Sequence, residues 1–394
     1  MGKIEKNRQH VEKKVSMSDR IRTSLIEKGA SIVAYADLSS IPEKYRKGYR
    51  YGIAIGVALA PEIVLGIKDG PTLAYYDEYK RVNSLLDELD EYAAELLRAK
   101  GFDALPKVRR AVEIDEETRR TELPHKTVAT RAGIGWIGKC ALLVTEAYGS
   151  AVRISSVLTN AALEVGVPIN TSGCGACTAC KNICPAGAVS GSHWEVHKDR
   201  DEFYNAFNCR KAAREKSGEI GINESLCGIC IRSCPWTKKY LRKGLISIAG
   251  GLELLPSVQP LWEQLRDHHG SISKHFSESI RKRTFADRAG DFEAKAQHHI
   301  FRIELVQREK AELPIGYCIT SLSNDLIGEV ESIFIDSQYR GLDIGDMLMK
   351  HALGWMESQG AKRKRIGVLA GNDTVLGFYE KYGFKVRTYI LEQN

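Results

Sequence analysis

The sequence predicts a multidomain protein in which α/β and α+β parts lie on either side of a cysteine-rich segment. Its length of 394 residues exceeds what one ordinary core holds, so two or three domains are expected. Eight of the ten cysteines fall between residues 174 and 234. Patterns typical of helices and of short apolar strands alternate before and after this segment. We therefore place domains at residues 1–165, 166–248 and 252–394.

Residues 1–165 are predicted to form an α/β domain. The segments 31–35 and 51–59 are rich in Ile, Val and Ala, which is typical of buried strands. Residues 85–100 carry apolar side chains at helical spacing and stop at Gly101, a residue type that commonly follows a helix. This alternation of strands and helices predicts a sheet covered by helices.

The cysteines form two runs whose spacing predicts iron–sulfur clusters. The first run has the pattern C-x-x-C-x-x-C-x-x-x-C-P, and the second is a lone cysteine followed by C-x-x-C-x-x-x-C-P. In such a run three thiolates hold one 4Fe–4S cluster, and the cysteine before the proline binds the neighbouring cluster. We assign one cluster to Cys174, Cys177, Cys180 and Cys234. The other cluster then has the ligands Cys184, Cys209, Cys227 and Cys230.

Zinc and disulfides are the alternatives for these cysteines. Zinc sites use four ligands in paired spacing and have no use for a C-x-x-C-x-x-C triplet. Disulfides need an oxidising compartment, and the first twenty residues are too polar for a secretory signal. We therefore expect a cytoplasmic redox protein. Cys140 and Cys318 stand outside the pattern and are interpreted as small buried hydrophobes.

Composition excludes a membrane protein and permits an anionic partner. Hydrophobic residues make up 43% and charged residues 27% of the chain, as in soluble globular proteins. No stretch approaches the ~20 apolar residues that span a bilayer. The net charge of +7 would suit a nucleotide, coenzyme A or RNA, but scattered surface lysines explain it equally well.

A glycine-rich segment precedes the cysteines. It contains Gly133, Gly135, Trp136, Gly138 and Lys139. Glycines at this spacing allow the backbone to approach a flat or charged ligand closely. A structural turn around a packed tryptophan would give the same pattern.

Roughly residues 20–245 resemble epoxyqueuosine reductase in several sequence motifs. The resemblance rests on RAGIGWIGK, GSAVRISSVLTNAAL, CGACTACKNICPAGAV and LCGICIRSCPW. That family, related to the reductive dehalogenases, carries cobalamin in an α/β domain beside two 4Fe–4S clusters. The resemblance implies that residues 125–160 form much of a corrinoid pocket, with the glycine-rich segment binding the cofactor. It also implies a small-molecule substrate and an external low-potential electron donor such as ferredoxin or flavodoxin.

The chain departs from that family at three points, one of which is the absence of the proline-centred segment after the family's acidic residue, where this chain has TELPHKTVA. The family has an aspartate that donates a proton, but counting back from Arg131 reaches Arg119 at its position. His125 becomes the candidate acid, because the pKa of a histidine in its ordinary range suits proton donation near neutrality; a core or surface histidine is the alternative. The helical-repeat tail that holds tRNA in the family has no counterpart here, so we do not expect tRNA as the substrate.

Residues 252–394 resemble a GNAT N-acetyltransferase domain. Helices are expected at 258–273 and 285–295, and strands at 301–306, 315–321, 327–335 and 365–369. Between the last two strands a loop leads into a long amphipathic helix, and a helix start with glycine turns can bind a pyrophosphate. The resemblance implies that acetyl-CoA is held by Arg340, Gly341, Ile344, Gly345 and Asn372. Asp343 takes the place of a motif glycine and brings a carboxylate close to the phosphates.

The same resemblance assigns catalytic roles in this part. Tyr379 matches the tyrosine that returns a proton to the thiolate leaving group. Glu329 and Glu331 share one strand face because side chains alternate, and we choose Glu331 as general base. A solvent-facing strand carboxylate is the alternative for Glu331.

The leading hypothesis is a bifunctional enzyme, an iron–sulfur and cobalamin-dependent reductase fused to an N-acetyltransferase. In one alternative the front part transfers electrons to a partner without a corrinoid. In another the GNAT-like part binds an acyl-CoA without turnover.

Overall fold

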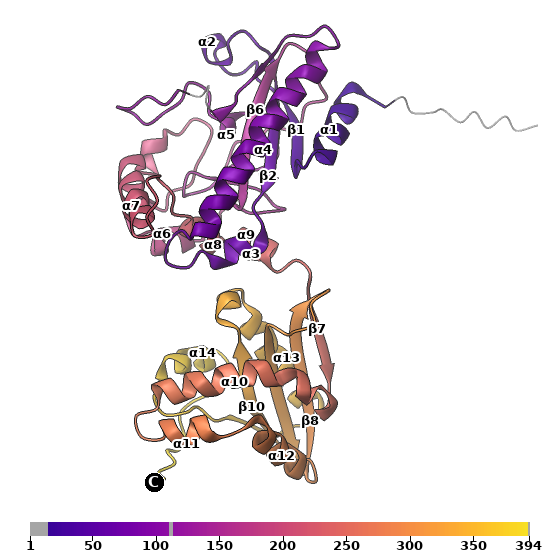
Figure 1. Ribbon diagram of the computed structural model, residues 1–394, viewed down its shortest axis with the longest axis vertical. Coiled ribbons are helices and arrows are strands. Elements are labelled where there is room, and N and C mark those ends of the chain that lie inside the picture. The colour runs from indigo at the N-terminus through magenta and orange to yellow at the C-terminus, as the bar shows by residue number, and fades with distance from the viewer. Residues whose placement is uncertain (1–14, 110–112, 393–394) are drawn as a thin grey trace, which may run out of the picture. The chain divides into compact units, whose positions relative to one another are not determined.

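The protein folds into two compact units, and each is described here by itself. The computed structural model describes residues 15–109 and 113–392 (Figure 1). The first unit comprises Met1–Leu241 and the second Arg242–Asn394. The α/β part predicted for residues 1–165 and the cysteine-rich part predicted for 166–248, as far as Leu241, thus share one compact unit.

A four-stranded antiparallel sheet forms the centre of the first unit. Its strands follow the order β1 (Ile32–Asp37), β2 (Tyr51–Ala58), β6 (Val152–Thr159) and β3 (Ala104–Pro106). Two further short strands, β4 (Trp136–Ile137) and β5 (Leu143–Val144), pair with each other. The strands expected at 31–35 and 51–59 are therefore present, and the mixed multidomain class is confirmed.

Helices cover both faces of this sheet. Helix α4 (Leu73–Arg98) lies on one face, where the Ser155 hydroxyl donates to Asp90 Oδ1 at 2.7 Å. Helix α5 (His125–Arg131) lies on the other face, where His125 Nδ1 is 2.9 Å from Ser156 Oγ. Neighbouring residues of β6 point to opposite faces, so the two contacts place the helices on opposite sides.

Helix α4 begins well before the expected residue 85. Thr72 caps it by accepting a hydrogen bond from the Tyr75 N–H at 3.1 Å. The first turns of α4 carry tyrosines and charged residues rather than a continuous apolar stripe. The helical spacing of apolar residues therefore did not indicate that the helix starts there. The remaining helices before the cysteines are short: α1 (Met17–Glu27), α2 (Glu43–Arg46) and α3 (Pro61–Gly66).

The cysteine-rich part consists of short helices and loops. Its elements are α6 (Ala179–Ile183), η2 (Arg200–Glu202), α7 (Ala206–Gly218), α8 (Ile229–Ser233) and α9 (Pro235–Leu241). Helices α6 and α8 pack against each other, so the two cysteine runs lie side by side.

The second unit is built on a five-stranded sheet. The order is β11 (Arg363–Ile366), β10 (Ile327–Ile335), β9 (Gly316–Ser323), β8 (His299–Arg308) and β7 (Leu245–Gly250). Neighbours are antiparallel except β10 and β11, which are parallel and connected through α13 (Ile344–Ser358). Strand β7 belongs to this sheet, so the unit begins at Arg242 rather than at the expected residue 252. The glycine pair at 250–251 suggested a linker, whereas it ends a strand.

Helices α10 (Leu255–Ile272) and α12 (Phe285–Lys295) pack on one face of this sheet. Trp262 and Phe292 from these helices share a core with Ile303 and Leu305 of β8. Glu304 points to the opposite face, where its carboxylate meets His351 of α13 at 2.6 Å. The other helices are α11 (Ser277–Lys282) and α14 (Leu376–Glu380), with 3-10 turns η3 (Leu252–Leu254), η4 (Ser337–Tyr339) and η5 (Asp373–Val375). Among the described residues, no helix combines the length and the apolar character that a membrane crossing requires.

Candidate functional sites

The predicted ligands of each cluster have neighbours within the same predicted group. Burial raises the pKa of the Cys209 thiol, and the nearby Cys184 raises it further. The pKa of Cys227 is raised by burial and by both of these cysteines. Burial and the proximity of Cys174 likewise raise the pKa of Cys234. Cluster binding would therefore deprotonate thiols whose charge is costly without iron.

The glycine-rich segment supports the cysteine loop rather than a cofactor cavity. The Lys139 ammonium is buried and donates to the carbonyls of Gly175 and Cys177 at 3.0 and 2.8 Å. A Cβ atom on Gly138 would lie 3.7 Å from the Cys174 sulfur. Trp136 packs in a core that Cys174 and Cys234 adjoin, and its ring N–H is buried with no partner among the described residues. An acceptor such as a cluster sulfide would satisfy this N–H, so these residues fit a 4Fe–4S group.

Gly133 and Gly135 are required by close packing of the chain on itself. A Cβ on Gly133, whose φ is +75°, would lie 2.5 Å from the Val167 carbonyl oxygen. On Gly135 it would lie 2.2 Å from the Val144 carbonyl oxygen. The structure thus favours the turn around a packed tryptophan over direct cofactor binding by this segment.

A cavity of about 940 Å³ opens in the first unit, within the size range of cofactor sites. One wall comes from the start of α5, with His125 and Lys126, and from β6. The segment that follows the glycines contributes Ile137 and residues 141–143, and the cysteine-rich part contributes Trp194 and Phe203. The cavity therefore lies between the sheet and the cysteine-rich part. None of the five glycine-rich-segment residues predicted to bind the cofactor lines it.

His125 lines the cavity, but its surroundings argue against the proton-donor role predicted for it. Burial lowers its pKa to about 4, and the positive charges of Lys107 and Arg153 act in the same direction. An imidazole with so low a pKa is neutral at pH 7 and carries no proton to donate there, which argues against the predicted role. The low pKa of His125 results from desolvation of its side chain in the fold, which the sequence alone does not show.

Lys126, the next residue, also lines the cavity and has the properties of a proton donor. Its ammonium donates to the Ala141 carbonyl at 2.6 Å, and burial lowers its pKa to about 8. Such a group is protonated at pH 7 and gives up its proton readily. The sequence offered no signal for it beyond its position beside His125.

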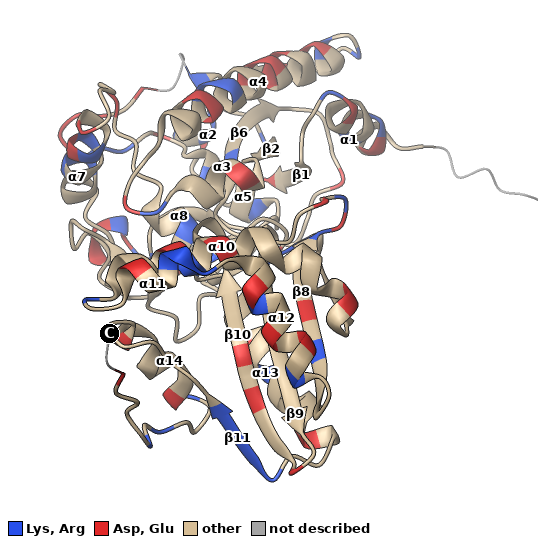
Figure 2. Ribbon diagram, turned by 60° about the horizontal axis from the view of Figure 1, so that its bottom comes forward, with Lys and Arg blue, Asp and Glu red and all other residues tan. Residues whose placement is uncertain are grey.

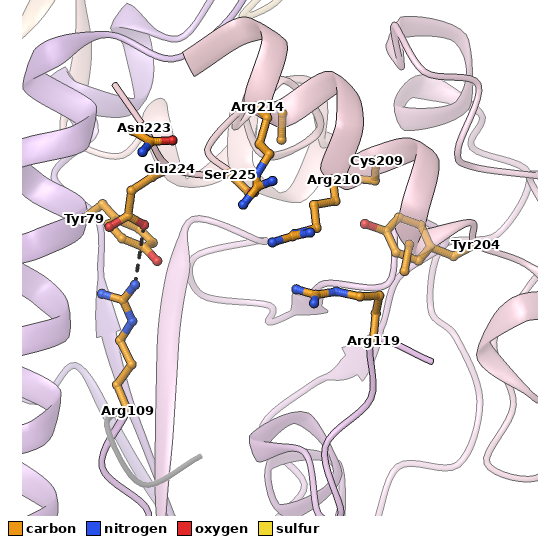
Figure 3. A pocket seen from close by; sticks show the side chains of 12 residues that line it. Tyr79, Arg109, Arg119, Tyr204, Cys209, Arg210, Arg214, Asn223, Glu224 and Ser225 are labelled. Carbon is orange, nitrogen blue, oxygen red and sulfur yellow. Dashed lines mark hydrogen bonds and ion pairs between the residues drawn. The ribbon is translucent and has the colours of Figure 1, made fainter. Parts of the chain in front are cut away.

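A second, arginine-rich cleft of about 500 Å³ lies beside Cys209 (Figure 3). Four arginines, Arg109, Arg119, Arg210 and Arg214, line it together with Cys209 itself. They were missed because they are widely separated in sequence and converge only in the fold. Arg119, at the position of the family aspartate, lines both this cleft and the cavity and has a positive φ of 55°.

In the second unit the predicted coenzyme A loop leads directly into α13. Gly341 and Asp343 both have positive φ, at 75° and 61°, which turns the chain sharply before the helix begins at Ile344. The first N–H groups of a helix have no partner within it and can bind an anion. Arg340 donates from Nε to the Ile335 carbonyl at 3.1 Å, so its side chain braces the loop.

The Asp343 carboxylate is neutralised by a residue that the sequence analysis did not consider. Arg242 Nη1 lies 2.7 Å from Asp343 Oδ2 and 3.1 Å from the Leu342 carbonyl oxygen. This ion pair compensates the negative charge that was expected to repel phosphate.

Tyr379 and Asn372 lie on the segment after β11. Phe378 comes within 3.4 Å of a Cβ placed on Gly345, and the Tyr382 hydroxyl donates to Asp346 at 2.5 Å, so α14 adjoins the start of α13. Burial, with Cys318 nearby, raises the pKa of Tyr379 to about 12. Its phenol is protonated at neutral pH, as a proton donor must be. Asn372 caps the turn η5 with no side-chain cap bond to it.

Glu331 is held in an ion-pair network. Its carboxylate contacts Lys295 and accepts from the Ser321 hydroxyl at 2.5 Å. Lys295 also binds Glu329 at 2.9 Å, and Arg365 of the parallel neighbour β11 binds Glu329 as well. Figure 2 shows β11 in the blue of basic residues and red acidic positions on β10. Taking a proton from an amine would require Glu331 to give up these partners, which argues against the base role predicted for it.

Comparisons with known proteins agree with this division. Residues 173–237 match the 4Fe-4S double cluster binding domain, and residues 262–384 match the acetyltransferase (GNAT) family. Epoxyqueuosine reductase of Listeria monocytogenes is 29% identical over 226 residues, which cover 57% of this chain and 55% of that protein. Epoxyqueuosine reductase of Bacillus subtilis is 44% identical over 68 residues, or 17% of each chain.

A solved epoxyqueuosine reductase with an epoxyqueuosine-modified tRNA stem loop is 22% identical and covers 56% of this chain and 65% of that one, with a TM-score of 0.37. The chain spans about half the length of the Listeria monocytogenes epoxyqueuosine reductase. It combines an epoxyqueuosine reductase-like iron–sulfur region with a GNAT domain in one polypeptide.

Proposed function

We propose that the first unit is an iron–sulfur reductase whose 940 Å³ cavity holds a corrinoid. The supporting observation is the position of the cavity wall. Ala141 lines the cavity, and the preceding residue, Cys140, lies beside the predicted cluster ligands Cys180 and Cys230. Electrons from the clusters thus need to cross little protein to reach the cavity. A bound corrinoid would supply a strongly reducing metal centre there.

The residues of the chain itself would bind the substrate and manage protons. Lys126 donates the proton that a reductive ring opening or elimination consumes, because its ammonium is held in the cavity wall by the Ala141 carbonyl. Arg119 and Arg200, which also line the cavity, favour a substrate or cofactor group with negative charge. Trp194 and Phe203 exclude water from the opposite wall.

We propose that the second unit transfers an acetyl group from acetyl-CoA to an amine. The loop before α13 supplies N–H groups for the pyrophosphate, and the ion pair of Arg242 with Asp343 keeps that surface from repelling it. Tyr379 returns a proton to the departing thiolate, which its protonated phenol allows.

The test uses the full chain, with clusters reconstituted under anaerobic conditions. Binding of cob(II)alamin is followed by electron paramagnetic resonance and binding of acetyl-CoA by calorimetry. Tight corrinoid binding supports the reductase, whereas intact clusters without it would leave the first unit an electron carrier. Absence of acetyl-CoA binding would contradict the transferase.

A further inference from the structure

We propose that the arginine-rich cleft beside Cys209 is the docking site for an acidic one-electron carrier protein, which reduces the cluster that Cys209 binds. This inference rests on the proposed iron–sulfur function of the first unit but not on a bound corrinoid. The transfer moves one electron from the reduced carrier to the oxidised cluster, and no bond is made or broken.

The cleft carries positive charge that the protein does not compensate. Arg109 is paired with Glu224 at 3.5 Å. Within residues 15–109 and 113–392, no carboxylate forms an ion pair with Arg119, Arg210 or Arg214. Figure 3 shows the side chains of these three arginines gathered around the cleft. All three guanidiniums line the same cleft of about 500 Å³, so their like charges lie close together. Bringing these charges together is costly unless an anionic partner arrives.

The charges surround a predicted cluster ligand. Helix α7 contributes Cys209, Arg210 and Arg214 to the same cleft, so the ligand and the cations are fixed on one rigid element. The Tyr204 hydroxyl lies beside the Cys209 thiol, and both residues line the cleft. A carrier bound over these arginines would therefore present its cofactor next to a cluster ligand with no intervening element.

A protein fits this surface better than a nucleic acid does. Single-stranded nucleic acids bind where bases can stack on open aromatic faces. Two aromatic residues line the cleft, Tyr79 and Tyr204. The guanidiniums of Arg109 and Arg153 cover Tyr79 at 5.2 and 4.3 Å from its ring centroid, and Tyr204 interacts with Cys209. Electron carriers, by contrast, form small transient complexes whose encounter is steered by opposite charge.

Stopped-flow reduction of the reconstituted full chain by flavodoxin hydroquinone tests the proposal. The variant Arg210→Glu/Arg214→Glu should lower the second-order rate constant at least about tenfold at low salt. Raising the ionic strength from ~0.01 M to ~1 M should slow the wild type strongly and the variant little, because the Debye length falls from ~30 Å to ~3 Å. Reduction by the methyl viologen radical, a small cation, should not slow in the variant.

Two controls distinguish a loss of carrier binding from a loss of the clusters or a general effect of net charge. Arg20→Glu/Lys28→Glu makes the same change in net charge at two exposed residues, Arg20 of α1 and Lys28, the C-cap residue of that helix, and should leave the flavodoxin rate unchanged. Arg214→Glu alone changes a residue five positions, or about one and a half helical turns, beyond Cys209. The iron content of this variant should match that of the wild type, while its rate of reduction by flavodoxin still falls. A flavodoxin rate that is unaffected in both cleft variants would overturn the proposal.

Two further outcomes also contradict it. If the variants lose affinity for a tRNA stem loop yet keep the flavodoxin rate, the cleft is a nucleic-acid site. If methyl viologen fails to reduce the wild-type chain, the iron–sulfur function itself is wrong, which is distinguishable from a failure of docking alone.

Discussion

Burial rather than residue type sets the acid–base chemistry of the cavity. His125 and Lys126 are neighbours on α5, yet burial lowers the pKa of His125 to about 4 and that of Lys126 to about 8. The group that is charged at pH 7 is the lysine. The charge is retained at a cost in stability, as is common for catalytic groups.

Replacing Lys126 should therefore stabilise the protein while removing the proposed acid. A lysine whose pKa is lowered in the folded state destabilises that state fully below pH 8, and the effect fades as the pH rises towards the pKa of the unfolded chain. We expect Lys126→Met to raise the free energy of unfolding by roughly 1–2 kcal/mol at pH 7, after the lost hydrogen bond to Ala141 is subtracted. The gain should shrink above pH 9. Anaerobic denaturant unfolding at both pH values measures it, with the exposed Lys211→Met as control. An equal gain at both pH values would count against a buried charge.

A second prediction about single residues follows from the ion pair of Arg242 with Asp343. Arg242→Ala leaves a carboxylate beside the pyrophosphate loop uncompensated, so acetyl-CoA affinity should fall about fivefold, the upper range for an exposed pair. Asp343→Gly should raise the affinity, because it removes the charge and suits the positive φ of 61°. Calorimetry of both variants decides this, with the exposed Lys350→Ala of α13 as control. Equal affinities in Arg242→Ala and the wild type would show that the loop binds no anion.

At the scale of elements, the β4–β5 pair and its glycines hold the first cluster loop in place. A methyl group on Gly135 cannot fit 2.2 Å from the Val144 carbonyl oxygen, so Gly135→Ala must separate the two strands. Trp136 and Lys139, which contact the cysteine loop, would move with them. We expect this variant to lose most of one cluster, measured as iron per chain. Gly218→Ala, at a helical glycine with open space around it, should keep the wild-type iron content. Full iron content in Gly135→Ala would contradict the supporting role.

Strand β7 gives a prediction about domain limits. It pairs with β8 from Leu245 to Gly250, and Ser247 contacts the buried Glu304. A fragment of residues 252–394 therefore exposes the edge of β8 and leaves Glu304 with fewer partners. We expect residues 242–394 to be folded and monodisperse, and residues 252–394 to aggregate or to melt at least several degrees lower. Circular dichroism and light scattering compare them. Equal melting temperatures would show that β7 is dispensable.

For the whole molecule, the sequence revealed chemistry carried by local motifs and missed chemistry carried by distant contacts. The cysteine runs and the GNAT elements have fixed spacing along the chain. The strand predicted at 327–335, for example, has the same bounds as the observed β10. The arginine-rich cleft was not visible, because Arg109 and Arg214 meet only in the fold. The low pKa of His125 depends on desolvation, and the ion pairs of Glu331 depend on Lys295 of another element. Neither leaves a local trace in the sequence.

The junction of the two units has a consequence for how the proposed activities are deployed. Helix α9 ends at Leu241 and β7 begins at Leu245, so only residues 242–244 separate them. A tether this short keeps each unit at an effective concentration in the millimolar range relative to the other, whatever the protein concentration. The two activities are also made and degraded together, in a fixed one-to-one ratio.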